Sequence, residues 1–121
     1  MATVTLQPGP EGLDNSIYQA NANANYGANV NILTGQVFGN VYRGMIKFDL
    51  SSLPSGVSIV SAILELNCSS AEQTAAWNVS AHRALTQWFE VNATGTPPTG
   101  DGSTWNHRNA NGSAAWSGGA G

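Results

Sequence analysis

The chain has 121 residues, of which 41% are hydrophobic and only 9% are charged, with a formal net charge of −3. This length fits one domain with a single core. Only four residues are lysine or arginine, too few for a basic patch that neutralises a phosphate backbone, and no apolar run is long enough to span a bilayer. Nucleic acids and membranes are therefore not expected partners.

Alternation of apolar and polar residues predicts β-strands along most of the chain. In chain order, the predicted strands are residues 4–7, 16–19, 30–37, 43–50, 60–68 and 77–85. Segments rich in Pro and Gly separate several of them, at residues 8–10, 53–56 and 96–100. Strands and turns spaced in this way indicate an all-β fold, an antiparallel β-sandwich of jelly-roll type.

Two predicted strands have a clear inward face. In residues 43–50 the inward face consists of Ile46, Phe48 and Leu50, and the outward face of Arg43, Met45 and Lys47. In residues 60–68 the inward face consists of Ala62, Leu64, Leu66 and Cys68. Cys68 is the only cysteine, so we predict a buried core thiol without an intrachain disulfide.

Three other segments are not predicted to be strands. The Asn-rich stretch Ala20–Asn29 is predicted to be an ordered loop, with a positive φ angle at Gly27. Residues 86–90 fit a short helical turn capped by Thr86. Residues 114–121 are predicted to be a loop, so we expect that the chain stops before its sandwich is closed.

Several pieces of the chain, taken in order, resemble a known family. They are Leu6-Gln-Pro-Gly-Pro-Glu-Gly12 with Asp14, Asn25-Tyr-Gly27, the run Ile46-Lys-Phe-Asp-Leu-Ser-Ser-Leu-Pro-Ser-Gly56 after Arg43, Ile59–Leu66, and His82-Arg83 followed by Trp88-Phe-Glu90 and Thr104-Trp-Asn106. Together they resemble the DNRLRE family of disaggregatase-related domains. The resemblance implies a jelly-roll β-sandwich like that of many carbohydrate-binding modules.

Members of that family normally continue for several more strands, and nothing here matches that part. We therefore expect a sandwich module at residues 1–106 that is incomplete without additional strands. Residues 107–121 are then a Gly/Ala/Ser/Asn-rich tail or the start of a continuation. A neighbouring protein subunit or a continuation of the same chain is the expected partner that completes the sheets.

Aromatic and amide side chains offer a candidate carbohydrate site. Flat rings stack on sugars while amides bond to hydroxyl groups, and the candidates for these roles are Asn25, Tyr26, Tyr42 and Trp77. The competing interpretation is that Tyr26 only packs its loop against the core. Trp88 and Trp105 are expected to close the core.

Acidic residues near the predicted turns offer a candidate calcium site. Glu11, Asp14 and Asp49 could supply carboxylate oxygens, together with loop carbonyl groups. The alternative is that Asp49 caps the turn at Ser51-Ser52. Apart from calcium, no cofactor is expected.

No motif places a nucleophile beside a base, and no pair of carboxylates is placed to face across a cleft, so we do not expect an enzyme. The main hypothesis is a structural or adhesive surface module of a larger assembly, most simply a phage virion component such as a capsid decoration, fibre or tail protein. The alternative is a carbohydrate-binding module of a secreted polysaccharide-active or cell-surface protein, with glycans as partners. The expected location is accordingly a virion surface or the extracellular space.

Overall fold

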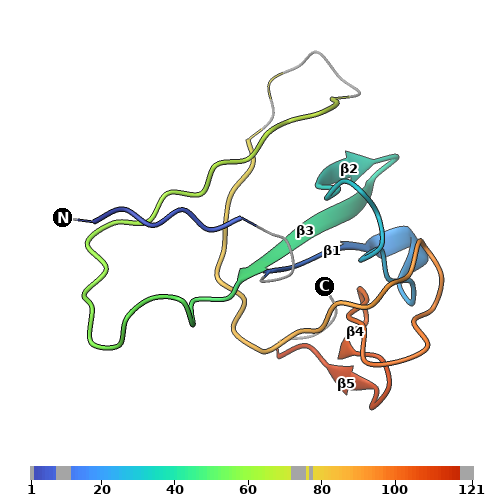
Figure 1. Ribbon diagram of the computed structural model, residues 1–121. Coiled ribbons are helices and arrows are strands. Elements are labelled where there is room, and N and C mark those ends of the chain that lie inside the picture. The colour runs from blue at the N-terminus through green and yellow to red at the C-terminus, as the bar shows by residue number, and fades with distance from the viewer. Residues whose placement is uncertain (1, 8–11, 72–75, 77, 118–121) are drawn as a thin grey trace. The chain divides into compact units, whose positions relative to one another are not determined.

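The structure is a computed structural model that describes residues 2–7, 12–71, 76 and 78–117 (Figure 1). Its regular elements, in chain order, are β1 (Gly12–Tyr18), the 3-10 helix η1 (Gln19–Asn21), β2 (Gly35–Val37), β3 (Asn40–Phe48), β4 (His107–Asn109) and β5 (Ala114–Ala115). The described residues are all-β with antiparallel sheets, as predicted, and are consistent with a small β-sandwich. No helix among them is long and apolar enough to cross a membrane.

The chain divides into two units. The first unit is Met1–Asp49 with Arg83–Gly121, and the second unit is Leu50–His82. All the strands named above lie in the first unit. The described residues of the second unit contain no helix and no strand. The two units are therefore stabilised in different ways.

The larger sheet has the strand order β1-β3-β2, with β3 in the centre. β1 pairs with β3 along its whole length, from Gly12↔Phe48 to Tyr18↔Tyr42. β2 and β3 form a hairpin, in which Gly35 lies opposite Tyr42 and Val37 opposite Asn40. The alternating pattern of residues 43–50 thus correctly predicts the central strand, which begins three residues earlier and ends at Phe48.

Both faces of this sheet carry buried side chains of β1. Residues directly opposite each other in an antiparallel pair share a face. Asn15 lies opposite Met45 and Ile17 opposite Arg43, and both Asn15 and Ile17 are buried. Within β3 itself, Arg43 and Lys47 are exposed and Ile46 and Phe48 are half-buried, as the alternation predicts, whereas Met45 is half-buried as well. On the other face, Ser16 lies opposite Gly44 and is also buried.

Residues 103–105 contact the face of the sheet that carries Asn15 and Arg43. The Asn15 amide donates hydrogen bonds to the Ser103 hydroxyl oxygen at 2.8 Å and to the Ser103 carbonyl oxygen at 3.1 Å. The Arg43 guanidinium carbon lies 5.0 Å from the Trp105 ring centroid, within range of a cation–π contact. On the other face, the Ser16 hydroxyl accepts a 2.7 Å hydrogen bond from the Leu33 N–H.

The core of the first unit is small and partly polar. Its buried apolar residues are Ile17, Ala24 and Trp88. Its buried polar residues are Asn15, Ser16, Asn25, Ser103 and Thr104. No buried side-chain nitrogen or oxygen in the described residues lacks a hydrogen-bond partner. Hydrogen bonds between segments that are distant in the sequence therefore take over much of the stabilising role that apolar contacts have in most domains.

The C-terminal segment contains structure where a loop is predicted. β5 pairs with β4, with His107 opposite Ala115 and an irregularity before Asn109. The Trp116 indole N–H donates a 3.0 Å hydrogen bond to the Thr104 carbonyl oxygen. The prediction of a loop is therefore wrong for Ala114–Ala115. Three consecutive small residues with no alternation gave no strand signal.

Several predicted strands do not form. Residues 4–7, 60–68 and the described part of 77–85 have no strand, and only the last three residues of 30–37 belong to one. Leu50 and Cys68, predicted to face the core, are exposed. Residues 86–90 form no helical turn, although Trp88 within them is buried as expected.

Candidate functional site

Three tyrosines of the first unit form a tyrosine cluster (Tyr18, Tyr26 and Tyr42). The rings of Tyr18 and Tyr42 are stacked, with centroids 3.8 Å apart and an interplanar angle of 3°. The Tyr26 ring meets Tyr42 edge-on, at 6.4 Å and 73°. The register explains the stack, because Tyr18 and Tyr42 are directly opposite in β1 and β3. All three rings are half-buried, so part of each remains in contact with solvent.

The residue opposite Tyr42 on β2 is Gly35, which has no side chain. Gly35 has a φ of 127°, and a methyl group placed on it would find no atom within 4 Å. The space around Gly35, at the edge of the sheet, is therefore open.

The loop that carries Tyr26 is fixed by its neighbour Asn25. Asn25 is fully buried; its amide N–H donates to the Ser103 carbonyl oxygen at 2.7 Å, and its amide oxygen accepts from the Gly27 N–H at 2.9 Å. The Tyr26 N–H in turn donates to the Asn15 side-chain oxygen at 3.0 Å. Asn25 thus holds the loop in place and has no surface to offer a ligand.

Gly27 is required for a reason other than the predicted one. Its φ angle is not positive, so that prediction is wrong. A Cβ at Gly27 would instead collide with the Val91 carbonyl oxygen and the Glu90 side chain. The close approach of two backbone segments therefore requires a glycine here. The prediction of an ordered, non-strand loop over Ala20–Asn29 is otherwise confirmed, with η1 at its start.

Uncharged amides lie on the same elements as the tyrosines. The Asn21 amide N–H donates to the Tyr26 hydroxyl oxygen at 3.2 Å and to the Gly95 carbonyl oxygen at 3.1 Å. In the β2–β3 hairpin, the Gln36 amide donates to the Gly39 carbonyl oxygen at 3.1 Å and the Asn40 amide to the Phe38 carbonyl oxygen at 3.4 Å. These N–H groups bond to the protein, which leaves the amide oxygens as acceptors for a ligand.

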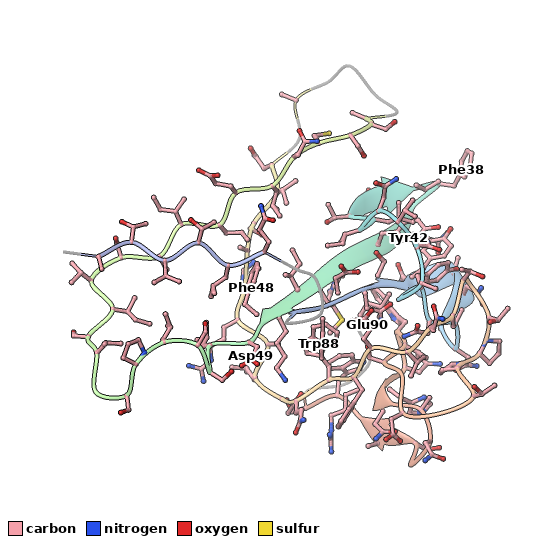
Figure 2. All side chains as sticks on the ribbon, in the orientation of Figure 1. Phe38, Tyr42, Phe48, Asp49, Trp88 and Glu90 are labelled. Atoms are coloured by element: carbon pink, nitrogen blue, oxygen red, sulfur yellow. The ribbon has the colours of Figure 1, made fainter. Side chains whose placement is uncertain are left out.

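Phe38 is the most exposed aromatic residue of the described chain. It lies with Gly39 in the two-residue turn between β2 and β3, and its side chain extends away from the sheet (Figure 2). Phe38 is 99% exposed and has a φ of 48°, while Gly39 has a φ of 83°. Two positive φ angles define a turn that Asn-Gly occupies at lower cost, so neither burial nor turn geometry accounts for a phenylalanine here.

The predicted calcium ligands are not brought together within the described residues. Glu11 lies outside those residues. Asp14 is half-buried on β1, and its backbone N–H donates to a carboxylate oxygen of Glu90 at 2.9 Å. Asp49 is exposed at the end of β3. No group of three or more His, Cys, Asp or Glu suited to a metal occurs among the described residues. The calcium site remains a prediction.

The Glu90 carboxyl group links the segment around Trp88 to β1, because it accepts the hydrogen bond from the Asp14 N–H. Burial raises the pKa of Glu90 above its ordinary value. The hydrogen bond from the Asp14 N–H acts in the opposite direction, and the negative charge of Asp14 adds to the rise. The shift fits a structural link between β1 and residues 88–91 and gives no evidence of catalysis.

Comparison with protein families bears directly on these side chains. The family model of carbohydrate-binding module family 96 matches residues 12–118. The chain belongs to carbohydrate-binding module family 96. This match includes both sheets, the tyrosine cluster and Phe38. No curated protein and no solved structure matches the chain.

The family assignment decides between two of the earlier interpretations. It supports a carbohydrate-binding module and so favours the alternative hypothesis over the phage virion component, which these comparisons do not support. It does not confirm the DNRLRE name, although the expected likeness to a carbohydrate-binding module holds. Such modules are typically non-catalytic and commonly extracellular or surface-associated.

Only some of the residues that the sequence offers as sugar contacts lie in the tyrosine cluster of this module. Tyr26 and Tyr42 are in the tyrosine cluster, whereas Trp77 lies outside the described residues. Tyr18, which the sequence also offers as an aromatic face, was not among the chosen candidates. Phe38 was missed too, but Phe38-Gly39 followed by a strong strand pattern is a turn signal that could have revealed an exposed aromatic ring.

Proposed function

We propose that this protein is a non-catalytic carbohydrate-binding module that binds a glycan chain at the tyrosine cluster, with Phe38 extending the same surface. The family match carries the ligand class. The partly exposed tyrosine cluster and the open space at Gly35, which is paired with Tyr42, support the location. The same chemistry suits an extracellular or cell-surface protein, where polysaccharides are found.

The chemistry of the site is stacking between a sugar and an aromatic ring. A pyranose ring presents a face of C–H groups that packs against a flat aromatic face and excludes water from both. Tyr42 has such a face next to Gly35, and Tyr18 holds the ring in place from its other side. A site prepared in this way loses little conformational entropy when a ligand binds.

Hydrogen bonds from the sugar hydroxyl groups to neutral amides complete the proposed contact. Asn21, Gln36 and Asn40 have amide oxygens that can accept from sugar hydroxyl groups. Asn25, predicted from the sequence as a contact, is assigned a supporting role because it is fully buried. Trp77 remains a candidate contact.

The experiment is a binding panel with the whole chain. Wild-type protein is tested against neutral and acidic polysaccharides by affinity electrophoresis, and the best ligand is then titrated by calorimetry. Tyr42→Ala should weaken binding about tenfold or more, because the stacking face is lost. Tyr42→Phe keeps the ring and should retain most of the affinity. The same polysaccharides, incubated with excess protein, should show no new reducing ends.

Phe38→Asn tests the hairpin separately from stability. Asparagine suits a positive φ, so this variant should be as stable as wild type or more stable by about 1 kcal/mol. It should nevertheless bind the glycan several-fold more weakly because the exposed ring is gone. No binding across the panel would refute the carbohydrate function, and binding that survives both Tyr42→Ala and Phe38→Asn would refute the location.

A further inference from the structure

The loop around Gly95 lies directly against one ring of the tyrosine cluster, and we propose that Gly95 is a positioning residue for Tyr26 in the glycan site. The proposal rests on the proposed function and adds a residue that acts on the ligand only through another side chain. A close contact, a backbone angle and a set of hydrogen bonds support it, and all of them lie within the first unit.

The contact between Gly95 and the Tyr26 ring is the first observation. A Cβ placed on Gly95 would lie 3.0 Å from Tyr26 Cε1, 3.5 Å from Cζ and 3.6 Å from the hydroxyl oxygen. Carbon atoms in favourable contact are about 3.5–4.0 Å apart, so a side chain at this position would press on the ring. The glycine therefore lets the Tyr26 ring lie close against the backbone of a distant segment.

The backbone angle of Gly95 is the second observation. Its φ is 78°, in the left-handed region that glycine adopts without a steric penalty. Gly56 has nearly the same φ, 79°, but a Cβ placed on Gly56 would find no atom within 4 Å. The two glycines share this angle and differ in whether a ring lies beside them, which makes Gly56 a matched control.

Hydrogen bonds hold Gly95 at both of its backbone polar groups. Its N–H donates to the Asn25 carbonyl oxygen at 2.9 Å, and its carbonyl oxygen accepts from the Asn21 amide at 3.1 Å. The Asn21 amide also donates to the Tyr26 hydroxyl oxygen at 3.2 Å. The carbonyl oxygen of the next residue, Thr96, accepts from the Asn25 N–H at 3.0 Å. Because Gly95 is fixed in this way, we expect an added side chain to displace the ring rather than the loop.

Displacement of the Tyr26 ring changes the site that a glycan meets. Tyr26 now lies at 73° to Tyr42, with ring centroids 6.4 Å apart. A ring that is already oriented costs little entropy when a ligand binds, whereas a displaced ring has to return against the added side chain. Gly95→Ala should therefore weaken glycan binding about two- to tenfold, the range that one aromatic contact contributes.

Calorimetric titration of the full chain, with the best polysaccharide of the binding panel, compares Gly95→Ala with Gly56→Ala. The Gly56 variant introduces the same strain at a positive φ and should bind the polysaccharide like wild type. Gly95→Asn is the second variant if Gly95→Ala does not fold, because asparagine tolerates a positive φ and still adds a Cβ. It should weaken binding by a similar factor.

A double-mutant cycle separates positioning from a general structural role. In a Tyr26→Ala background the ring is absent, so Gly95→Ala should change the affinity less than about twofold there. Equal losses in both backgrounds, or equal affinities of the Gly95 and Gly56 variants, would overturn the proposal. Binding that Tyr42→Ala abolishes and Gly95→Ala leaves unchanged would overturn this proposal alone. A wild type that binds no polysaccharide would overturn the proposed function together with it.

Discussion

The two units of the chain differ in which side chains are buried and in how many hydrogen bonds connect their segments. The first unit has few buried apolar residues, yet hydrogen bonds between distant segments close it, such as those from Asn15 and Asn25 to Ser103. The second unit contains the clearest apolar alternation of the sequence, yet Val60, Ile63 and Leu66 are exposed. The difference teaches that alternation specifies a strand only where a backbone partner is in reach.

The largest expected effect contrasts one apolar residue from each unit. Trp88 is buried in the first unit, at 4% exposed, so Trp88→Ala should lower the free energy of unfolding by about 3–5 kcal/mol through loss of burial and creation of a cavity. Val79 in the second unit is 67% exposed, and Val79→Ala should change the free energy of unfolding by less than about 0.5 kcal/mol. Urea denaturation followed by circular dichroism measures both.

A further variant keeps this contrast interpretable if Trp88→Ala does not fold. Trp88→Phe retains much of the buried ring and should recover most of the stability. Equal, small losses for Trp88→Ala and Val79→Ala would mean that the first unit has no effective core, which would break the comparison between the units.

The next effect contrasts two asparagines. Asn25→Ala removes one of the two hydrogen bonds to the buried Ser103 carbonyl oxygen and leaves the Gly27 N–H without its partner, and should cost about 1–3 kcal/mol. Asn67→Ala, in the exposed segment of the second unit, should cost less than about 0.5 kcal/mol. Thermal unfolding of both variants in the same buffer gives the comparison, and similar melting temperatures would show that polar bonds do not hold the first unit together.

The smallest expected effect is a change of stability with pH, and it tests the link between β1 and Glu90. The pKa of Glu90 is raised above its ordinary 4.5 by burial, so the folded state binds this proton more tightly than the unfolded state does. Stability is then greatest below the unfolded pKa and is partly lost as pH rises through the folded pKa. Glu90→Gln still offers an oxygen to the Asp14 N–H but cannot ionise.

Melting temperatures of wild type and Glu90→Gln, from about pH 4 to about pH 8, test this link. The wild type should lose some stability across the lower part of that range, and the variant should lose less. Parallel curves for the two proteins would show that the Glu90 carboxylate is not linked to folding.

A strand was predicted correctly from the sequence where an alternating segment also has neighbouring strands to pair with. Residues 43–50 alternate, and β3 forms because β1 and β2 flank it on both sides. Residues 60–68 alternate equally well but form no strand, because no described segment pairs with them. Of the residues predicted as a carbohydrate site, Tyr26 and Tyr42 belong to the tyrosine cluster, whereas Asn25 beside them is buried. Sequence spacing cannot tell an amide that faces a ligand from one that holds a loop.

The sequence by itself determined the all-β class, the position of the central strand and the lack of a basic surface, because alternation, turn residues and charge are local properties. Only the tertiary structure decided which tyrosines stack, since Tyr18 and Tyr42 are 24 residues apart in number and meet through the register of β1 on β3. It also decided that the Asn15 amide of β1 is buried and hydrogen-bonded, because Ser103 reaches it from the far end of the chain. Burial is a property of what packs against a residue, and a single strand does not contain that information.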